Sequence, residues 1–489
     1  MRSTGRTKVA TDRTQRSIQN PQSKTQNQSA NDPLTAICSR FTEKRAEVGV
    51  IGLGYVGLPL ALLFSRRGFS TTGFDIDPEK VEKLEHGESY IRHIAADAIA
   101  AQREQKRFQV TTDFAVLRQM DAIIICVPTP LDEHREPDLS HVCHTAESVQ
   151  PHLRAGQLVI LESTTYPGTT DEVLLPILRR SGLRCSVVPY ATDGHTVTAG
   201  DSADVDFLLA FSPEREDPGN RNFQTHQIPK VMGGVNAASV RAAQALYQQV
   251  FERVILVSSS RAAEMTKLLE NIYRCVNIAL VNELKLLCLR MGIDIWEVIE
   301  AARTKPFGFT PFYPGPGLGG HCIPVDPFYL TWKAREYDFP TRFIELAGEV
   351  NASMPGHAVA AVADALNGRK QCLHGARILV LGVAYKKDVD DPRESPSFHI
   401  IQLLQERGAQ VDYHDPYFPY LPKMRRYDLP SMTAVEPTAE ALRRYDAVVI
   451  ATDHSSYDYA HIVRHAKLVV DTRNATQAVK EGRENVVRC

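Results

Sequence analysis

The sequence predicts an α/β protein in which two doubly wound, parallel-sheet domains are joined by a helical middle region. Short apolar runs alternate with helical patterns from residue 47 to residue 211 and again from residue 377 to residue 471. Such alternation is typical of strands connected by crossover helices in a parallel sheet. Between the two regions, a helical pattern runs from Ala262 to Met291. It is much longer than an ordinary surface helix, which predicts a long central helix.

The length and composition limit what the chain can be. Its 489 residues exceed one ordinary core, at about 100 to 200 residues per domain. The 56 Lys and Arg nearly balance the 58 Asp and Glu, so no global charge favours nucleic acid or an anionic membrane. The nine cysteines form no Cys-x-x-Cys pair, and no apolar run approaches the about 20 residues that span a bilayer. We expect a cytoplasmic protein without metal, nucleic-acid or membrane partners.

Composition and periodicity divide the chain into four parts. Residues 1–46 are polar and poor in acids, which predicts a disordered tail. They superficially resemble an organelle transit peptide but lack its amphipathic stripe. The predicted first domain covers residues 47–235, the helical region 236–345 and the second domain 346–489. Residues 185–206 are expected to form an extended surface loop.

Each α/β domain is built from short predicted elements in chain order. In the first we expect strands at Val48–Leu53, Ser70–Asp75, Ala122–Val127, Gln157–Glu162 and Asp206–Phe211, with a helix at Leu58–Arg67. In the second we expect strands at Arg377–Val383, Gln410–His414, Asp446–Ala451 and Leu468–Asp471, with a helix at Ser397–Arg407.

A glycine motif follows the first predicted strand. In Gly-Leu-Gly-Tyr-Val-Gly, residues 52–57, Gly52 allows a tight turn, Gly54 lets the backbone approach a pyrophosphate, and Gly57 lets the helix pack on the sheet. Asp75 ends the next strand, where a carboxylate can bind ribose hydroxyls and would repel a 2′-phosphate. The motif therefore predicts a Rossmann-like domain that binds NAD rather than NADP.

Polar residues follow three further strands of this domain. Thr129 lies in Ile-Cys-Val-Pro-Thr-Pro, a hydroxyl-rich turn covers residues 161–170, and Glu214 follows the strand that ends at Phe211. The carboxyl ends of parallel strands line the ligand crevice, so Thr129 can contact the cofactor. The hydroxyls of the turn fit either a helix cap or a catalytic role. Glu214 is either a solvated surface acid or a base that activates water.

Two pairs of basic or polar residues lie further along the chain. Lys267 and Asn271, four residues apart, share one face of the long helix. They are either exposed or, if they face the crevice, able to stabilise an alkoxide or oxyanion. Lys386 and Arg393, within residues 382–396, suit phosphate or carboxylate binding unless that loop is simply exposed.

Cys322 lies in the run Pro-Gly-Pro-Gly-Leu-Gly-Gly-His-Cys-Ile-Pro-Val-Asp-Pro, residues 314–327. The glycines let the backbone approach a ligand, while His321 adjoins the cysteine and Asp326 follows it. A thiol can add to an aldehyde, and the hemithioacetal can lose a second hydride to give a thioester. The alternative is a small buried apolar side chain. Beside a dinucleotide site, Cys322 predicts oxidation of an alcohol to a carboxylate.

These motifs, in this order and spacing, resemble the UDP-glucose/GDP-mannose dehydrogenase family across residues 47–475. The resemblance implies oxidation of C6 of a nucleotide-linked sugar to the acid with reduction of two NAD, in a homodimer or larger homo-oligomer built on the long helix. It implies these catalytic roles: Cys322 as nucleophile, Lys267 and Asn271 as oxyanion stabilisers, Asp326 as the group that orients water or alkoxide, Glu214 as the thioester-hydrolysis base, and Thr164 as holder of the catalytic water.

The resemblance also implies two sets of ligand contacts. The NAD set is Gly52, Gly54, Tyr55, Val56, Gly57, Asp75, Lys80, Thr129, Thr164 and Arg393. The UDP-sugar set is Glu214, Arg215, Asp217, Lys267, Asn271, Pro311, Phe312, Tyr313, Pro314, Gly315, Gly319 and Lys386. On this basis residues 47–235 bind NAD, 236–345 carry the dimerisation helix and the cysteine loop, and 346–489 form a Rossmann-like domain that binds the UDP-sugar.

Two positions near the cysteine bear on the sugar. Pro306 and Val325 stand where UDP-glucose enzymes usually have an arginine and a lysine, and residues 305–327 are most similar to the UDP-N-acetylglucosamine 6-dehydrogenase branch. UDP-N-acetylmannosamine and UDP-glucose remain alternative substrates. The rival classes are a two-electron hydroxyacid dehydrogenase and a non-catalytic nucleotide-sugar binding protein. The product of the preferred reaction is a precursor of surface polysaccharide.

Overall fold

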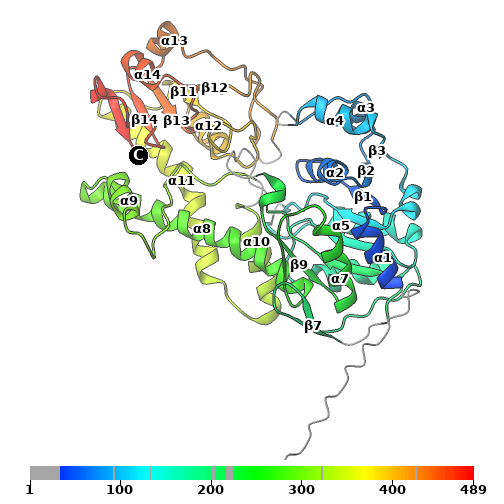
Figure 1. Cartoon of the computed structure of the whole chain (residues 1–489). Helices are drawn as coiled ribbons and strands as arrows, with labels where there is room; N and C mark the ends of the chain where they lie inside the picture. The colour runs from blue at the N-terminus through cyan, green and yellow to red at the C-terminus, as the bar shows by residue number, and fades with distance from the viewer. Residues whose placement is uncertain are drawn as a thin grey trace, which may run out of the picture.

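A computed structural model describes residues 33–91, 94–132, 134–200, 204–215, 224–320, 323–424 and 427–489. It confirms the predicted class, with two largely parallel sheets and long helices between them (Figure 1). Three residues singled out in the sequence, Asp217, His321 and Cys322, lie outside the described residues.

The N-terminal sheet has eight strands in the order β10-β9-β8-β5-β4-β1-β2-β3. They are β1 (Glu47–Ile51), β2 (Ser70–Phe74), β3 (Phe108–Thr111), β4 (Ala122–Ile125), β5 (Leu158–Leu161), β8 (Leu208–Phe211), β9 (Lys230–Gly234) and β10 (Val254–Leu256). All neighbours pair in parallel except β8 and β9, which are antiparallel. Strands β4 and β5 are buried along their whole length because helices cover both faces of a doubly wound sheet.

The helices of this domain are α2 (Gly57–Arg66), α3 (Pro78–Glu85), α4 (Ala96–Glu104), α5 (Ser140–Val149), α6 (Leu175–Arg179) and α7 (Ala237–Tyr247). Because β10 pairs with β9, the domain extends past the predicted boundary at residue 235. The expected surface loop at 185–206 contains a hairpin, β6 (Tyr190–Thr192) and β7 (Val197–Gly200). The Tyr190 hydroxyl donates to the carbonyl of Val257 at 2.7 Å, so the hairpin packs on the sheet and the loop prediction is wrong there.

Part of the predicted tail is folded. Helix α1 (Pro33–Thr42) packs against α7 and buries Ile37 and Phe41 in the core of the first domain. The Arg40 guanidinium also pairs with Asp121 at 2.5 Å. Ile37 and Phe41 lie four residues apart, so they share one face of the helix. The prediction of disorder is therefore wrong for residues 33–46, and residues 1–32 lie outside the described residues.

The middle of the molecule consists of α8 (Ser260–Met291), α9 (Ile295–Arg303), α10 (Asp326–Ala334) and α11 (Arg342–Asn367). The predicted central helix is α8, which ends at Gly292 with φ 69° as a left-handed cap. Helix α11 spans the predicted boundary at residues 345 and 346, and it packs across α8 (Figure 1). The side chain of Asn351 bonds Asn282 at 2.9 Å and the carbonyl of Cys275 at 3.1 Å.

The C-terminal sheet is parallel, in the order β12-β11-β13-β14-β15. Its strands are β11 (Arg377–Leu381), β12 (Gln410–His414), β13 (Ala447–Ile450), β14 (Val469–Asp471) and β15 (Val486–Arg488), and its helices are α12 (Pro396–Glu406), α13 (Ala439–Arg444) and α14 (Tyr459–His465). Within the described ranges, none of the helices has the length and apolar character needed to cross a bilayer.

Candidate active site

The glycine motif forms the turn between β1 and α2. Gly52 has φ +90°, and a Cβ there would lie 2.7 Å from the carbonyl oxygen of Cys126. A Cβ on Gly57 would overlap the carbonyl oxygen of Gly52. At Gly54, by contrast, no atom of the described residues other than Gly54 and its two chain neighbours lies within 4 Å of the Cβ position, so this part of the backbone is open to a ligand. The turn fits a dinucleotide pyrophosphate.

Asp75 follows β2 and is only 6% exposed. Its oxygens accept the amide of Leu53 at 2.9 Å and that of Asp77 at 3.0 Å, and the Lys80 ammonium lies 3.5 Å away. A carboxylate offers about four acceptor positions, so Asp75 can hold the turn and still accept ribose hydroxyls. Asp75 therefore lies at the end of β2, as the sequence predicted, with Lys80 beside it, and the residues present fit NAD.

Arg393 brings the second domain to this turn. Its guanidinium lies 4.7 Å from the centroid of the Tyr55 ring and pairs with Asp391 at 2.6 Å. The carbonyl of Arg393 also accepts the amide of Gly320 at 2.9 Å, at the end of the glycine run that leads to Cys322. One residue of the C-terminal domain thus contacts both the dinucleotide turn and the cysteine loop.

The hydroxyl-rich turn is fixed to β4 and to α8. The Thr129 hydroxyl donates to the carbonyl of Thr164 at 2.8 Å. The buried carboxyl of Glu264, on α8, accepts the amides of Gly168 at 2.6 Å and Thr170 at 2.9 Å. Burial raises the pKa of Glu264 to about 8. Glu264 precedes Lys267 by almost one helical turn of α8. By binding Gly168 and Thr170, Glu264 holds the hydroxyl-rich segment 161–170 near the face of α8 that carries Lys267.

Lys267, Asn271 and Asp326 are all buried, with 7%, 5% and 2% of their surfaces exposed. The Asn271 amide donates to a carboxyl oxygen of Asp326, at the start of α10, over 2.5 Å. Burial raises the pKa of Asp326 to about 6, and the Lys267 charge and the Asn271 hydrogen bond partly oppose that rise. The structure thus brings together a cation, an amide donor and a carboxyl, a set that can stabilise an alkoxide and move a proton.

Glu214 belongs to a buried charge cluster that the sequence did not reveal. Lys230, at the start of β9, lies 2.7 Å from Glu162 and 3.3 Å from Glu214, and the hydroxyl of Tyr247 donates to Glu162. Burial raises the pKa of Glu162. The sequence did contain a signal for this cluster, because the charged residues Glu162 and Lys230 directly adjoin apolar runs that form strands. Lys230 holds Glu214 at the end of β8.

The side chain of Arg215 is already engaged. It pairs with Glu270 on α8 at 2.6 Å and donates to the carbonyl of Pro229 at 2.6 Å. Arg215 was expected to contact the sugar, but these bonds tie the segment after β8 to α8.

The glycine run passes between α8 and the C-terminal domain. The Gly315 amide donates to Asn282 at 2.9 Å, and a Cβ on Gly319 would lie 2.6 Å from that of Tyr385. Arg473, which the sequence did not single out, places its guanidinium beside Gly315 and pairs with Asp453 at 3.2 Å. Glycine is needed at these two positions because residues of the C-terminal domain approach the backbone too closely for a Cβ.

The side chains of Phe312 and Tyr313, just before the glycine run, point toward α8 and α9. The Phe312 ring lies 5.6 Å from that of Tyr273, and the Tyr313 ring stacks on Trp296 at 5.8 Å. The Tyr313 hydroxyl donates to Glu300 at 2.6 Å. These aromatic side chains pack on α8 and α9, and the structure gives them no contact with the turn at residues 52–57 among the described residues.

The loop that carries Lys386 is held by a buried acid. Asp415, at the end of β12, accepts the amides of Val383 at 2.7 Å and Ala384 at 2.8 Å, and the His454 ring lies 3.2 Å away. Asp75 holds Leu53 in the same way in the first domain. The half-buried Lys386 directly follows Tyr385, which lies against Gly319 and Gly320.

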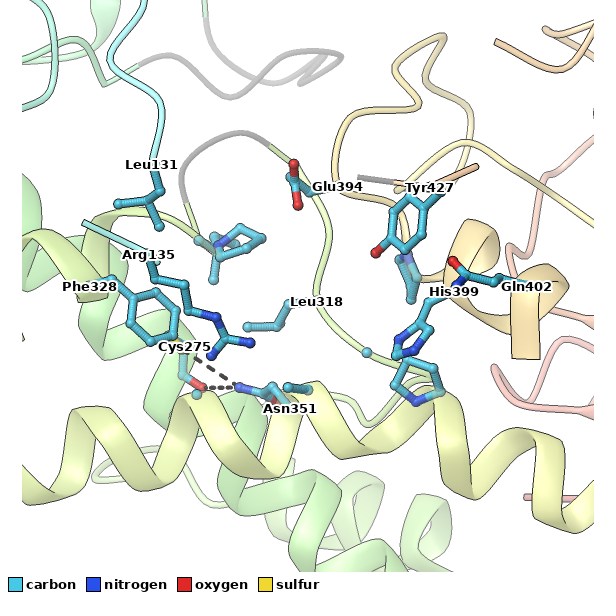
Figure 2. A pocket seen from close by; sticks show the side chains of 17 residues that line it. Leu131, Arg135, Cys275, Leu318, Phe328, Asn351, Glu394, His399, Gln402 and Tyr427 are labelled. Carbon is cyan, nitrogen blue, oxygen red and sulfur yellow. Dashed lines mark hydrogen bonds between the residues drawn. The ribbon is translucent and has the colours of Figure 1, made fainter. Parts of the chain in front are cut away.

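A cavity of about 350 Å³ adjoins the cysteine loop. Figure 2 shows Leu318 and Asn351 on its floor and His399, Gln402 and Tyr427 on one side, with Arg135 opposite. The Arg135 guanidinium lies 5.1 Å from the Phe328 ring centroid. Both domains and α11 contribute to this cavity, and its polar residues were not predicted.

Comparison with known proteins agrees with this geometry. Three models of the UDP-glucose/GDP-mannose dehydrogenase family match the chain: the NAD binding domain at residues 46–251, the central domain at 261–353 and the UDP binding domain at 379–478. UDP-N-acetyl-D-glucosamine 6-dehydrogenase of Pseudomonas aeruginosa is 34% identical over 416 residues, which cover 85% of this chain and 92% of that protein. UDP-N-acetyl-D-mannosamine dehydrogenase of Escherichia coli is 34% identical over 434 residues, covering 88% and 98%.

Solved structures give the same relationship. The UDP-D-ManNAc dehydrogenase of Pyrococcus horikoshii superimposes with a TM-score of 0.77 at 31% identity, covering 90% of this chain and 98% of the other. A UDP-glucose dehydrogenase of Pyrobaculum islandicum gives a TM-score of 0.76 at 28% identity, with 91% and 96% covered.

Proposed function

The chain belongs to the UDP-glucose/GDP-mannose dehydrogenase family, and from this premise we propose that it oxidises C6 of a UDP-N-acetylhexosamine to the acid, with NAD as hydride acceptor. The preferred substrate is UDP-N-acetylglucosamine, and the product supplies surface polysaccharide synthesis. The observation that carries the proposal is the buried Lys267–Asn271–Asp326 cluster, in which Asp326 follows Cys322 by four residues in the sequence.

The chemistry divides among residues of this chain. NAD, when bound, accepts a hydride from C6 in each of the two oxidations. Lys267 and Asn271 stabilise negative charge on the C6 oxygen, and Asp326 orients them and takes part in proton transfer. The Cys322 thiolate adds to the aldehyde to give a hemithioacetal, whose oxidation gives a thioester. Glu214, held by Lys230, deprotonates the water that hydrolyses the thioester, and Thr164 holds that water.

The choice of sugar rests on the segment before the cysteine. Pro306 and Val325 depart from the UDP-glucose pattern, and relatives that act on UDP-N-acetylglucosamine and UDP-N-acetylmannosamine have the same 34% identity to the chain. UDP-N-acetylmannosamine is therefore the second candidate.

A panel of UDP-sugars, each assayed for NADH and for the sugar acid, tests the proposal. We expect turnover with UDP-N-acetylglucosamine and two NADH per acid formed. Activity confined to UDP-glucose would overturn the substrate, and one NADH per sugar would support a two-electron dehydrogenase. Absence of turnover with every UDP-sugar would favour a binding protein.

Replacing Asp75 with serine is expected to raise the KM for NAD at least about tenfold, because the ribose loses a charged hydrogen-bond acceptor. Activity with NADP should rise relative to NAD, since the carboxylate no longer repels the 2′-phosphate. Steady-state kinetics with both cofactors provide the measurement. Asp113→Ser, at an exposed helix cap, is the control. Unchanged cofactor preference would contradict the assignment of Asp75.

We also propose a homodimer or larger homo-oligomer built on α8. Large apolar side chains remain exposed on this helix, including Tyr273 at 51%, Leu280 at 53% and Leu287 at 51%. These three recur every seven residues, as in a helix that packs along another helix. A monomer would leave this apolar stripe in water.

The double substitution Leu280→Glu and Leu287→Glu is expected to reduce the particle mass in solution to that of one chain, because carboxylates would be buried at the helix contact. Light scattering after size-exclusion chromatography measures this mass. Tyr420→Glu, at an exposed position in the C-terminal domain, should leave it unchanged. An unaltered mass in the double variant would show that α8 is not the contact.

A further inference from the structure

His454 is a fully buried histidine in the C-terminal domain, four residues after the end of β13. It belongs to none of the catalytic or ligand-binding sets expected from the sequence. A buried polar ring needs hydrogen-bond partners, and this ring finds them on two other segments of the chain. One is the end of β12, and the other is the loop between β11 and α12 that carries Lys386.

The two nitrogens of this ring have different partners. The backbone amide of Asp388 lies 3.0 Å from Nδ1, and a carboxyl oxygen of Asp415 lies 3.2 Å from Nε2. A backbone amide can only donate, so Nδ1 must be the acceptor and Nε2 must carry the proton. Burial opposes ionisation of Asp415, yet its hydrogen bond with the ring helps to lower its pKa, so the acceptor is a carboxylate. His454 is therefore a neutral imidazole in one defined tautomer.

These bonds fix the loop at one point on each side of Lys386. Asp415, to which the ring donates, accepts the amide of Ala384 at 2.8 Å. Four residues later, the amide of Asp388 is bonded directly to the ring. Lys386 lies midway between these two points, so His454 and its carboxylate partner together set the position of the backbone that carries it.

The loop has further contacts with the segment after β13. The Thr452 hydroxyl donates to the carbonyl of Ala384 at 2.7 Å, and the Asp388 carboxylate accepts the amide of Ser455 at 2.7 Å. Neither contact involves the ring of His454. The domain can therefore keep its fold when the ring is replaced, while the direction of the Asp388 amide depends on the ring.

We propose that His454 is a positioning residue for the UDP-sugar, because its neutral ring holds residues 383–388 and thereby sets the place of Lys386. The family resemblance assigns Lys386 to the UDP-sugar, and at this point the inference rests on the proposed function. An ammonium is a compact charge, so its attraction to a phosphate depends on where the backbone places it. Loss of the bond to Asp388 should therefore weaken nucleotide binding without removing any group that contacts the nucleotide.

Two substitutions separate the two bonds of the ring. The side-chain amide of asparagine can place an oxygen near the position of Nδ1, whereas that of glutamine can place a nitrogen near the position of Nε2. His454→Asn keeps an acceptor for the Asp388 amide and should bind UDP within about threefold of the wild type. His454→Gln keeps a donor toward Asp415 but no acceptor for that amide, and should bind UDP at least about tenfold more weakly.

Calorimetric titration with UDP is the measurement, and His374→Gln, at an exposed position in the same domain, should bind as the wild type does. In turnover, His454→Gln should raise the KM for the UDP-sugar and leave kcat within about twofold, since the reacting groups are untouched. Equal UDP binding by the wild type and both His454 variants, equal weakening in both variants, or no UDP binding by the wild type would overturn the inference.

Hydrogen exchange of the wild type gives a test that needs no variant. The Asp388 amide should be protected from exchange because it is bonded to a buried ring. Exchange at the rate of a free amide would overturn the inference. NADH formation by the wild type tests the proposed function separately. A wild type that binds UDP without turnover would refute that function, while the UDP titrations would still decide the role of His454.

Discussion

Replacing Cys322 with alanine is expected to reduce formation of the sugar acid by about 10⁴-fold or more, because the thioester route loses its nucleophile. The first hydride transfer needs no thiol, so a single turnover should still give NADH and an aldehyde. Rapid mixing with detection of NADH, together with trapping of the aldehyde, measures the two oxidations separately. A matched loss of both would mean that Cys322 serves binding or folding.

Cys372→Ala is the matched control for this experiment. Cys372 is exposed and lies between α11 and β11, in the C-terminal domain. The same loss of a thiol there should leave acid formation and the melting temperature unchanged. If Cys322→Ala still forms the acid at the wild-type rate, the covalent route is wrong and the second oxidation must proceed through the aldehyde hydrate.

The elements predicted best from the sequence are those with a local signal. Buried strands such as β4 and β13 are short apolar runs, and the end of α8 is marked by Gly292. The turn at residues 52–57 could be predicted because its glycines are required by contacts within the motif itself. A Cβ on Gly57, for example, would overlap the carbonyl oxygen of Gly52. The position of Asp75 beside this turn was predictable because it depends on strand order, which the alternation of elements already implies.

The features that escaped prediction depend on contacts between distant segments. Lys230 and Glu162 are 68 residues apart and meet only because β5 and β9 lie on either side of β8. Helix α1 lies within a polar segment, and its apolar face has meaning only once α7 is beside it. The direction of Tyr313, toward Trp296 rather than the crevice, is set by where α9 packs. The composition of the chain and the spacing of its residues do not reveal such contacts between distant segments.

Asp326→Asn is expected to lower kcat by about 100-fold, the typical contribution of a positioned proton-transfer group. The wild type should lose activity as the pH falls through about 6, because the ionised carboxylate is the form that orients Asn271 and Lys267. In the variant that acidic limb should disappear, since no group titrates at this position. The pH dependence of kcat for both proteins is the measurement, and an acidic limb that persists near pH 6 would assign it to another group.

The same substitution should stabilise the protein. The pKa of Asp326 is raised from 3.8 to about 6 in the folded chain, so below pH 4 the carboxyl is protonated in both states and has no cost. As the pH rises from 4 to 6, the unfolded state loses its proton first and the wild type loses stability. Above pH 6 the full cost remains, about 3 kcal/mol for a shift of about two units.

Denaturant unfolding of Asp326→Asn and the wild type should therefore diverge between pH 4 and pH 8, with the variant more stable at the higher pH. Asp338→Asn is the control, because Asp338 is exposed and its φ of 52° suits asparagine equally well. A variant that is slower yet more stable would mean that the fold keeps a destabilising buried carboxylate for its chemistry. Equal stabilities at pH 8 would show instead that Lys267 and Asn271 fully compensate the buried charge.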